Sequence, residues 1–234
     1  MEEQWFSVDG VAYRARQEPD LRFLKPYGRV FYVFDGQMSG NLCFGVAGKY
    51  GKLFVKYAGA RTLNYTGRIE DAVYSLKAAM PIYAVAHPAL IKLLAHGATN
   101  EGYAAVFQWR DAPVLRPVPP DPTIADRVRA LQAYRKLKML DMVYDLHACL
   151  AEEGYIAVDF TDGNVLIDFD RDEAIVCDID LYRKKPVFND RGRMPGSSRF
   201  MSPEEYTLGA ALDERSTVYA MGALAFEFFG ENQN

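Results

Sequence analysis

Three polar residues in the second half of the chain have types and spacing that suit metal and phosphate chemistry. Asp159 follows an apolar run, Asn164 comes five residues later at the start of an expected hairpin, and Asp178 closes that hairpin's second strand. Because paired hairpin strands are antiparallel, Asn164 and Asp178 are expected at the same end. Carboxylate and carboxamide oxygens suit Mg²⁺ together with phosphate. The alternative, polar strand ends that face solvent, stays open for this triplet alone.

A lysine in the first third of the chain could supply a matching cation. Lys56 lies in the strand-like segment LFVKY (53–57), where alternate residues from Leu53 share one face and Phe54 and Lys56 share the other. A lysine in the middle of an apolar strand needs an anion nearby, although a position on an edge strand is the commoner reason for such a pattern. Together with the Asp–Asn–Asp array, this lysine completes a set of groups able to hold a nucleoside triphosphate and its metal.

The composition is that of an acidic, globular chain. Its 234 residues include 27 Lys and Arg and 31 Asp and Glu, for a formal net charge of −4. This balance argues against a nucleic-acid partner, which needs a concentrated basic face. Three scattered cysteines predict neither a disulfide framework nor a zinc site and favour a reducing compartment. Without a signal-peptide pattern or a segment long enough to span a membrane, a cytoplasmic protein is expected.

Apolar runs and alternation predict that the first part of the chain is mainly β-structure. The expected strands are residues 30–34, 41–46, 53–57, 103–109, 164–169 and 174–177. The first of these, VFYVF, is interpreted as a buried strand because it is continuously apolar. The last two form the hairpin, and the aspartates of its turn, from Asp168 to Asp172, are expected to be solvated.

Helical periodicity is strongest after the middle of the chain. The expected helices are residues 67–80, 133–150 and 218–229. Pro81 is expected to interrupt the first, and an apolar stripe that includes Leu137 defines the second. Five prolines between residues 112 and 122 exclude a regular element there, so this segment is the best candidate for a linker between two lobes.

Several segments resemble the motifs of eukaryotic-type (Hanks-type) serine/threonine protein kinases, in the same order and over about residues 30 to 230. Asp159-Phe-Thr-Asp-Gly-Asn164 resembles the catalytic loop, and Cys177-Asp-Ile-Asp-Leu181 stands where the family has its metal-binding Asp-Phe-Gly. Residues 196–204 (GSSRFMSPE) resemble the end of an activation segment, and residues 213–222 (DERSTVYAMG) resemble the start of the helix that follows it.

The resemblance implies a bilobal α+β protein kinase-like fold. Residues 1–110 would form an antiparallel β-rich, nucleotide-binding N-lobe with one helix. Residues 111–234 would form a mostly helical C-lobe that lacks its last helices. The chain would be a divergent, bacterial member that transfers the γ-phosphate of ATP to a protein Ser or Thr hydroxyl, with Mg²⁺ as the cofactor.

The same resemblance implies a role for each matching residue. Asp159 would accept or orient the proton of the substrate hydroxyl, Asn164 and Asp178 would hold Mg²⁺, and Lys56 would contact the α- and β-phosphates of ATP. The remaining expected nucleotide-site residues are Gly40, Gln108 and Trp109. The candidate autophosphorylation sites are Ser197 and Ser198, with Ser202 as a further one.

Departures from the family pattern leave alternatives open. The loop from Asp35 to Gly40 keeps one glycine of the glycine-rich motif, and Asp35 would repel phosphates. Glu70 is only a distant candidate for the helix glutamate that pairs with Lys56. Thr161 replaces a catalytic-loop lysine, and Thr217 replaces the buried aspartate that ties this loop. A small-molecule (aminoglycoside-type) kinase and a non-catalytic, ATP-binding pseudokinase are therefore the alternatives.

Overall fold

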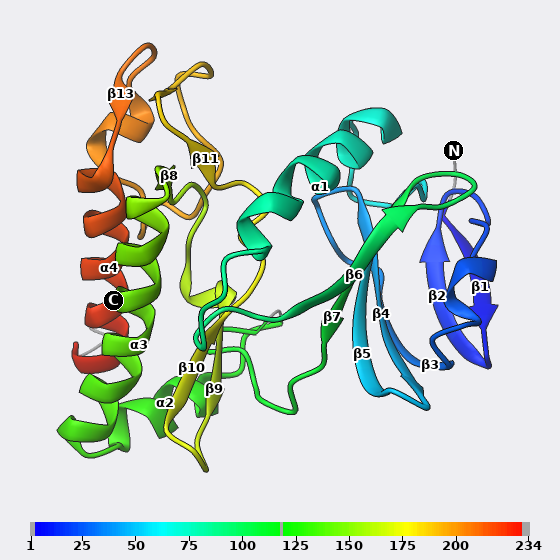
Figure 1. Ribbon diagram of the computed structural model, residues 1–234, viewed down its shortest axis with the longest axis horizontal. Coiled ribbons are helices and arrows are strands. Elements are labelled where there is room, and N and C mark those ends of the chain that lie inside the picture. Colours follow the sequence, from blue (N-terminus) through cyan, green and yellow to red (C-terminus); the bar gives the residue numbers. More distant parts are fainter. Residues whose placement is uncertain (1–2, 118, 231–234) are drawn as a thin grey trace. The chain divides into compact units, whose positions relative to one another are not determined.

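The computed structural model describes residues 3–117 and 119–230 of the chain. In this part of the chain the structure is mixed α+β, with antiparallel sheets and four α-helices (Figure 1). The chain divides into two compact units, one of residues 1–84 and 92–109 and one of residues 85–91 and 110–234. None of the helices in the described part is both long and apolar enough to cross a bilayer.

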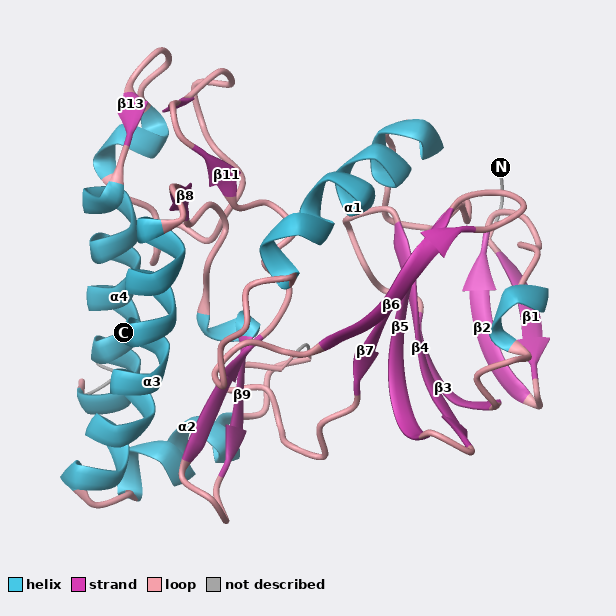
Figure 2. Ribbon diagram, viewed as in Figure 1, coloured by secondary structure: helices cyan, strands magenta, loops and turns pink. Residues whose placement is uncertain are grey.

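The first unit is built on a five-stranded antiparallel sheet in the order β3-β4-β5-β7-β6 (Figure 2). Its strands are β3 (Arg29–Phe34), β4 (Asn41–Gly48), β5 (Gly51–Ala58), β6 (Leu93–Ala98) and β7 (Tyr103–Gln108). An N-terminal hairpin, β1 (Gln4–Val8) and β2 (Val11–Ala15), precedes the short 3₁₀ helix η1 (Arg22–Leu24). The strands expected from the sequence are confirmed, whereas the N-terminal hairpin and β6 were not anticipated.

Two expectations for this unit are wrong. The apolar strand β3 is not buried, because it forms the edge of the sheet and leaves Tyr32 52% exposed. Helix α1 (Ile69–Tyr83) continues through Pro81 to Tyr83. A proline so close to the end of a helix removes one backbone hydrogen bond, and the burial of Ile82 and Tyr83 offsets that loss.

The two faces of the sheet have different partners. Leu53, Val55 and Tyr57 of β5 lie in a core cluster that also contains Tyr13 of β2 and Leu24 of η1, so the N-terminal hairpin covers this face. The opposite face carries Phe54 and Lys56. Phe107 of β7 is the cross-strand neighbour of Phe54 and contacts Tyr83 of α1 at a ring-centroid distance of 4.9 Å. The alternation read from the sequence is therefore confirmed.

The described residues of the second unit form three α-helices and three small two-stranded sheets. The helices are α2 (Pro122–Ala130), α3 (Ala133–Glu152) and α4 (Glu214–Phe229). The paired strands are β8 (Tyr155–Ile156) with β11 (Arg183–Lys184), β9 (Val165–Asp168) with β10 (Glu173–Val176), and β12 (Val187–Phe188) with β13 (Ala211–Leu212). Two 3₁₀ helices, η2 (Asp162–Asn164) and η3 (Pro203–Tyr206), complete it. Helices α3 and α4 lie side by side (Figure 1).

Helix α3 follows its expected stripe except near its start, where Ala133 and Leu137 are exposed. Leu140, Val143 and Leu146 are buried, but Leu137 is 58% exposed. The buried face instead includes Met139, which fills the same side of the helix as Val143. A stripe of apolar residues defines a helix face only approximately, and the neighbours decide which edge of the stripe is covered.

The proline-rich segment is more structured than expected. The backbone N–H of Leu115 donates to the Val165 carbonyl, and that of Ile167 donates to the Pro113 carbonyl, so this segment pairs with β9. Helix α2 then begins at Pro122 after Asp121, whose carboxylate accepts from the backbone N–H of Thr123. An aspartate at the cap followed by proline is a sequence pattern typical of the first residues of a helix.

Candidate functional site

The β9–β10 hairpin brings Asn164 next to the Cys177–Asp178 segment, as the sequence predicted. Val165 pairs with Val176, so the residues flanking this pair meet at one end. The Cys177 N–H donates to the Asn164 carbonyl over 2.8 Å. The Asn164 side chain donates from Nδ2 to the Asp178 carbonyl over 3.2 Å. One buried asparagine thus joins the segment after Asp159 to the segment that carries Asp178.

Asp159 and Asp178 share an uncommon backbone conformation. Their φ angles are +62° and +55°, in the left-handed region that non-glycine residues rarely adopt. The other two aspartates with positive φ, Asp9 and Asp172, lie in the turns of hairpins, where this conformation is ordinary. Asp159 and Asp178 lie outside such turns. Strained conformations of this kind cluster at functional sites, where the surrounding structure over-determines them.

The carboxyl group of Asp159 is electrostatically strained as well. Burial, with smaller contributions from the nearby charges of Asp178 and Glu205, raises its pKa to about 6. Glu205 is itself buried and accepts hydrogen bonds from the backbone N–H and the hydroxyl of Ser202. Gly196 and Ser197 line the small space around Asp159 together with Glu205. This arrangement leaves Asp159 ready to bind a proton near neutral pH.

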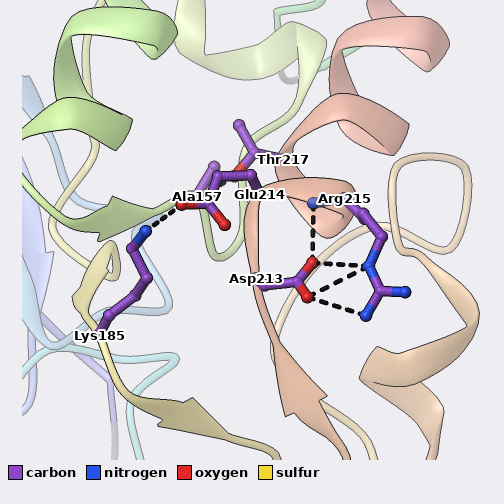
Figure 3. A network of polar contacts seen from close by, with 6 residues as sticks. All are labelled: Ala157, Lys185, Asp213, Glu214, Arg215 and Thr217. Atoms are coloured by element: carbon purple, nitrogen blue, oxygen red, sulfur yellow. Dashed lines mark hydrogen bonds and ion pairs between the residues drawn. The ribbon is translucent and has the colours of Figure 1, made fainter.

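The strand before Asp159 is held by helix α4. The Thr217 hydroxyl accepts a hydrogen bond from the Ala157 N–H over 3.1 Å, and both groups are buried. Figure 3 shows Ala157, which follows β8, beside Thr217 in the first turn of α4. At the start of this helix Asp213 accepts from the Arg215 N–H as the cap, and Lys185 pairs with Glu214. Thr217, noted as a departure from the family pattern, therefore still ties the chain two residues before Asp159.

A buried histidine supports the residue after Asp159. His147 Nδ1 lies 2.7 Å from the Val143 carbonyl, which can only accept, so this nitrogen carries the proton. Its Nε2 then accepts from the Tyr182 hydroxyl at 2.7 Å, and the imidazole packs edge-on against Phe160. Burial lowers the pKa of His147 to about 4, so the ring is neutral. This histidine therefore has a structural role.

An arginine that the sequence analysis did not select connects three elements of this unit. Arg199, in the segment that resembles an activation segment, donates to the buried carboxylate of Asp162 over 2.6 Å and also pairs with Glu227 of α4. Arg116 lies 3.8 Å from the same Asp162 carboxylate. Asp162 lies between Asp159 and Asn164. The Arg199 pairs therefore fix the segment 196–204 against the loop that carries Asp159.

Asn164 and Asp178 fit a Mg²⁺ site in their donor types. Among the described residues no three His, Cys, Asp or Glu side chains form a metal cluster. Mg²⁺ commonly binds one or two carboxylates together with substrate phosphates, so a closed cluster is not required. However, Asn164 Oδ1 accepts from both the backbone N–H and the hydroxyl of Thr161. The hydroxyl would have to rotate away before this oxygen could bind a metal.

In the first unit, Lys56 occupies the middle strand of the sheet. Strand β5 lies between β4 and β7, with Cys43 and Ala105 as the neighbours of Lys56 on either side. The side chain is only 5% exposed. The edge-strand explanation is therefore wrong for this lysine. A buried ammonium group requires a compensating acceptor, so this position excludes a solvated role for Lys56.

The loop from Asp35 to Gly40 is anchored within the first unit. The Asp35 carboxylate accepts from the backbone N–H and the guanidinium of Arg14, which lowers the pKa of Asp35 and neutralises the charge that would repel phosphate. Gly40 has φ +81°, and a Cβ there would come within 2.9 Å of Ala72 and 2.8 Å of the Tyr65 ring. Close packing is thus a sufficient reason for this glycine.

Gly40→Ala is expected to lower the free energy of unfolding by about 2 kcal/mol without nucleotide, because the positive φ and the crowding by Tyr65 and Ala72 both oppose a side chain. Urea denaturation measures this loss. Gly36→Ala is the matched control in the same loop, since no atom lies within 4 Å of a Cβ there and a change within about 0.5 kcal/mol is expected. Equal stabilities of the two variants would contradict the packing role.

The other expected nucleotide-site residues lie at the end of β7. Trp109 packs against Phe31, with ring centroids 5.0 Å apart, and against Phe34. Gln108 is exposed, and its backbone N–H donates to the Lys92 carbonyl. Glu70 is exposed at the start of α1 and pairs with Arg68. Nucleotide binding by Gln108 and Trp109 stays a prediction.

The candidate phosphorylation sites differ in accessibility. Ser198 is exposed and Ser197 is partly buried beside Asp159. Ser202 is buried, and its hydroxyl is bonded to Glu205 in the cap of η3. A phosphate on Ser202 would break that cap and place charge beside a buried carboxylate, so Ser202 is excluded as a site in the folded chain.

Comparisons with known proteins leave the chain without an assigned family. No protein-family model matches it, and no curated protein sequence matches it.

Proposed function

We propose that this chain is an ATP- and Mg²⁺-dependent phosphotransferase with a bilobal, protein kinase-like fold, and that it phosphorylates Ser or Thr hydroxyls of proteins. The observation that carries the proposal is the arrangement around Asn164. Its side chain and its carbonyl bind the Cys177–Asp178 segment, and Asp159 and Asp178 both adopt left-handed backbone conformations. A solvated acidic turn would not need the hydrogen bonds that Asn164 makes to this segment.

Phosphoryl transfer depends mainly on alignment and on the stabilisation of charge. In the proposal, Asp159 accepts or orients the proton of the substrate hydroxyl. A pKa of about 6 suits this role, since the carboxylate is mostly ionised at neutral pH yet retains affinity for a proton. Lys56 contacts the α- and β-phosphates, and Asn164 and Asp178 hold Mg²⁺. When bound, the metal neutralises charge on the phosphates.

A protein substrate is favoured by the segment 196–204. Arg199 holds this segment against Asp162 of the loop that carries Asp159, and Ser197 lines the space beside Asp159. An ordered segment at this place can position an extended peptide hydroxyl near the proposed base. The exposed Ser198 is the better candidate for autophosphorylation on accessibility alone.

A non-catalytic ATP-binding protein is the second candidate. The observation that favours it is the double hydrogen bond from Thr161 to Asn164 Oδ1, which occupies both acceptor positions of that oxygen. Such a protein would be stabilised by ATP without turnover. At about 100 times the dissociation constant, a ligand at one site adds about 2.7 kcal/mol to the free energy of unfolding.

The deciding experiment is transfer of labelled γ-phosphate to the chain itself and to a generic protein substrate. Asp178→Ala and Lys56→Met are expected to abolish labelling, whereas Asp170→Ala, at an exposed position of the β9–β10 turn, is expected to retain it. Labelling that survives in Asp178→Ala would contradict the metal assignment. Stabilisation by Mg²⁺ and ATP without turnover would support the second candidate, and phosphorylation of an aminoglycoside alone would identify a small-molecule kinase.

A further inference from the structure

A cavity of about 300 Å³ lies within the second unit, and neither Asp159 nor Asp178 lines it. Its walls come from the segment before α2, from one face of α2 between Pro122 and Arg129, from η2 and from the end of α4. The lining is mostly apolar and includes Leu115, Pro120 and Pro122. The volume falls within the range of pockets that hold small organic molecules.

The acidic side chains in this cavity are already engaged. Asp162 and Glu227 both pair with Arg199. Asp121 accepts from the backbone N–H and the hydroxyl of Thr123 at the start of α2. A cationic ligand would therefore have to displace Arg199 or uncap a helix before it could pair with these carboxylates.

The basic side chains keep unused donors. Arg129 lines the cavity and pairs with Asp126 through Nη2, but its Nη1 is buried and has no hydrogen-bond partner in the described part of the chain. A buried donor without an acceptor carries a desolvation penalty, which a ligand acceptor would relieve. Arg116 also lines the cavity, is half-exposed, and lies too far from Asp162 for a direct hydrogen bond.

We propose that this cavity binds a small organic anion, whose carboxylate or phosphate oxygens are bound by Arg129 and Arg116 and whose apolar body contacts Leu115 and the prolines. Planar guanidinium groups match the geometry of both oxyanions. Pro122, the first residue of the nine-residue helix α2, also lines the cavity, and a helix N-terminus favours negative charge. The inference does not depend on phosphotransfer.

Isothermal titration calorimetry with phenyl phosphate, benzoate, benzyl alcohol and benzamidine tests the proposal on the full chain. At least one of the two anions is expected to bind, and benzyl alcohol and benzamidine are expected to bind at least tenfold more weakly. Which anion binds more tightly distinguishes a phosphate ligand from a carboxylate ligand. Arg129→Ala should weaken binding of the anion by about 10- to 100-fold, because the variant loses a charge-assisted hydrogen bond to it.

Arg127→Ala is the matched control, because it removes the same charge from the same helix at a residue that stacks on Phe169 and does not line the cavity. Unchanged anion affinity in this variant is expected. Each variant's thermal transition establishes that it is folded, and the dependence on Arg129 separates this cavity from the proposed nucleotide site. Equal weakening by both variants, preferential binding of benzamidine, or no binding of either anion at millimolar concentration would overturn the proposal.

Discussion

Asp159→Asn is expected to make the protein more stable and inactive at the same time. Asparagine has nearly the same shape and tolerates the left-handed backbone of this position, so the packing around Gly196 and Glu205 is retained. The substitution removes a largely buried negative charge. We expect the free energy of unfolding to rise by about 2 kcal/mol at about pH 7.5, after allowance for partial solvent screening.

The pH dependence of this gain identifies its cause. The pKa of Asp159 is raised in the folded state from 3.8 to about 6, so the folded chain binds this proton more tightly than the unfolded chain. That contribution to stability is fully present below the unfolded pKa and is lost as the pH rises through about 6. The advantage of Asp159→Asn over the unmodified chain should therefore be close to zero near pH 4 and reach its full size above pH 7.

Urea denaturation of both proteins over this pH range measures the difference. His147 has the opposite sign, because its lowered pKa makes acid destabilising, but it is present in both proteins and cancels. Asp170→Asn, at the exposed turn, is the control and should change stability by less than about 0.5 kcal/mol at any pH. A gain that does not vary with pH would show that charge is not its origin.

The loss of activity tests the proposed role independently. If Asp159 accepts or orients the hydroxyl proton, γ-phosphate transfer should fall by at least about 100-fold in Asp159→Asn, the usual contribution of a positioned base. The same variant should still be stabilised by Mg²⁺ and ATP. If the variant is more stable, loses transfer and retains nucleotide binding, Asp159 lowers the stability of the protein because its charge is needed for phosphate transfer.

Arg199→Ala is expected to cause the largest loss of stability. The substitution leaves the buried carboxylate of Asp162 and the partly buried carboxylate of Glu227 without their shared cation, and only Arg116 remains near Asp162 among the ion pairs of the described residues. Breaking a buried ion pair from one side typically costs 3–5 kcal/mol, and the partial exposure of Arg199 reduces our expectation to about 3 kcal/mol in the free energy of unfolding. Chemical denaturation measures the loss.

Two further variants separate unpaired charge from lost packing. Arg199→Met combined with Asp162→Asn and Glu227→Gln removes all three charges and should recover most of the lost stability. Arg215→Ala breaks an exposed pair with Asp213 and should cost less than about 1 kcal/mol. If the triple variant were as unstable as Arg199→Ala, the uncompensated carboxylates would not be the cause.

The sequence predicted the local features of this protein well. Alternation with a period of two placed Lys56 and Phe54 on one face of β5, because strand geometry sends neighbouring side chains to opposite faces. Hairpin pairing placed Asn164 beside Asp178 for an equally local reason. Helix α2 was missed although Asp121 and Pro122 mark its start, since nine residues among prolines show little periodicity.

Only the tertiary structure decided which of these residues are buried and which distant residues they contact. A strand is central or at an edge according to its neighbours, so the sequence could not exclude an edge position for Lys56 or foresee the exposure of Tyr32. The contacts of Thr217 with Ala157 and of Arg199 with Asp162 join residues 60 and 37 positions apart. Local propensity cannot predict such pairs. The free energy of each pair depends on how deeply its groups are buried and on the entropy cost of bringing distant parts of the chain together. The sequence thus determined the elements and the faces of the site residues, and the packing of each unit determined their environment.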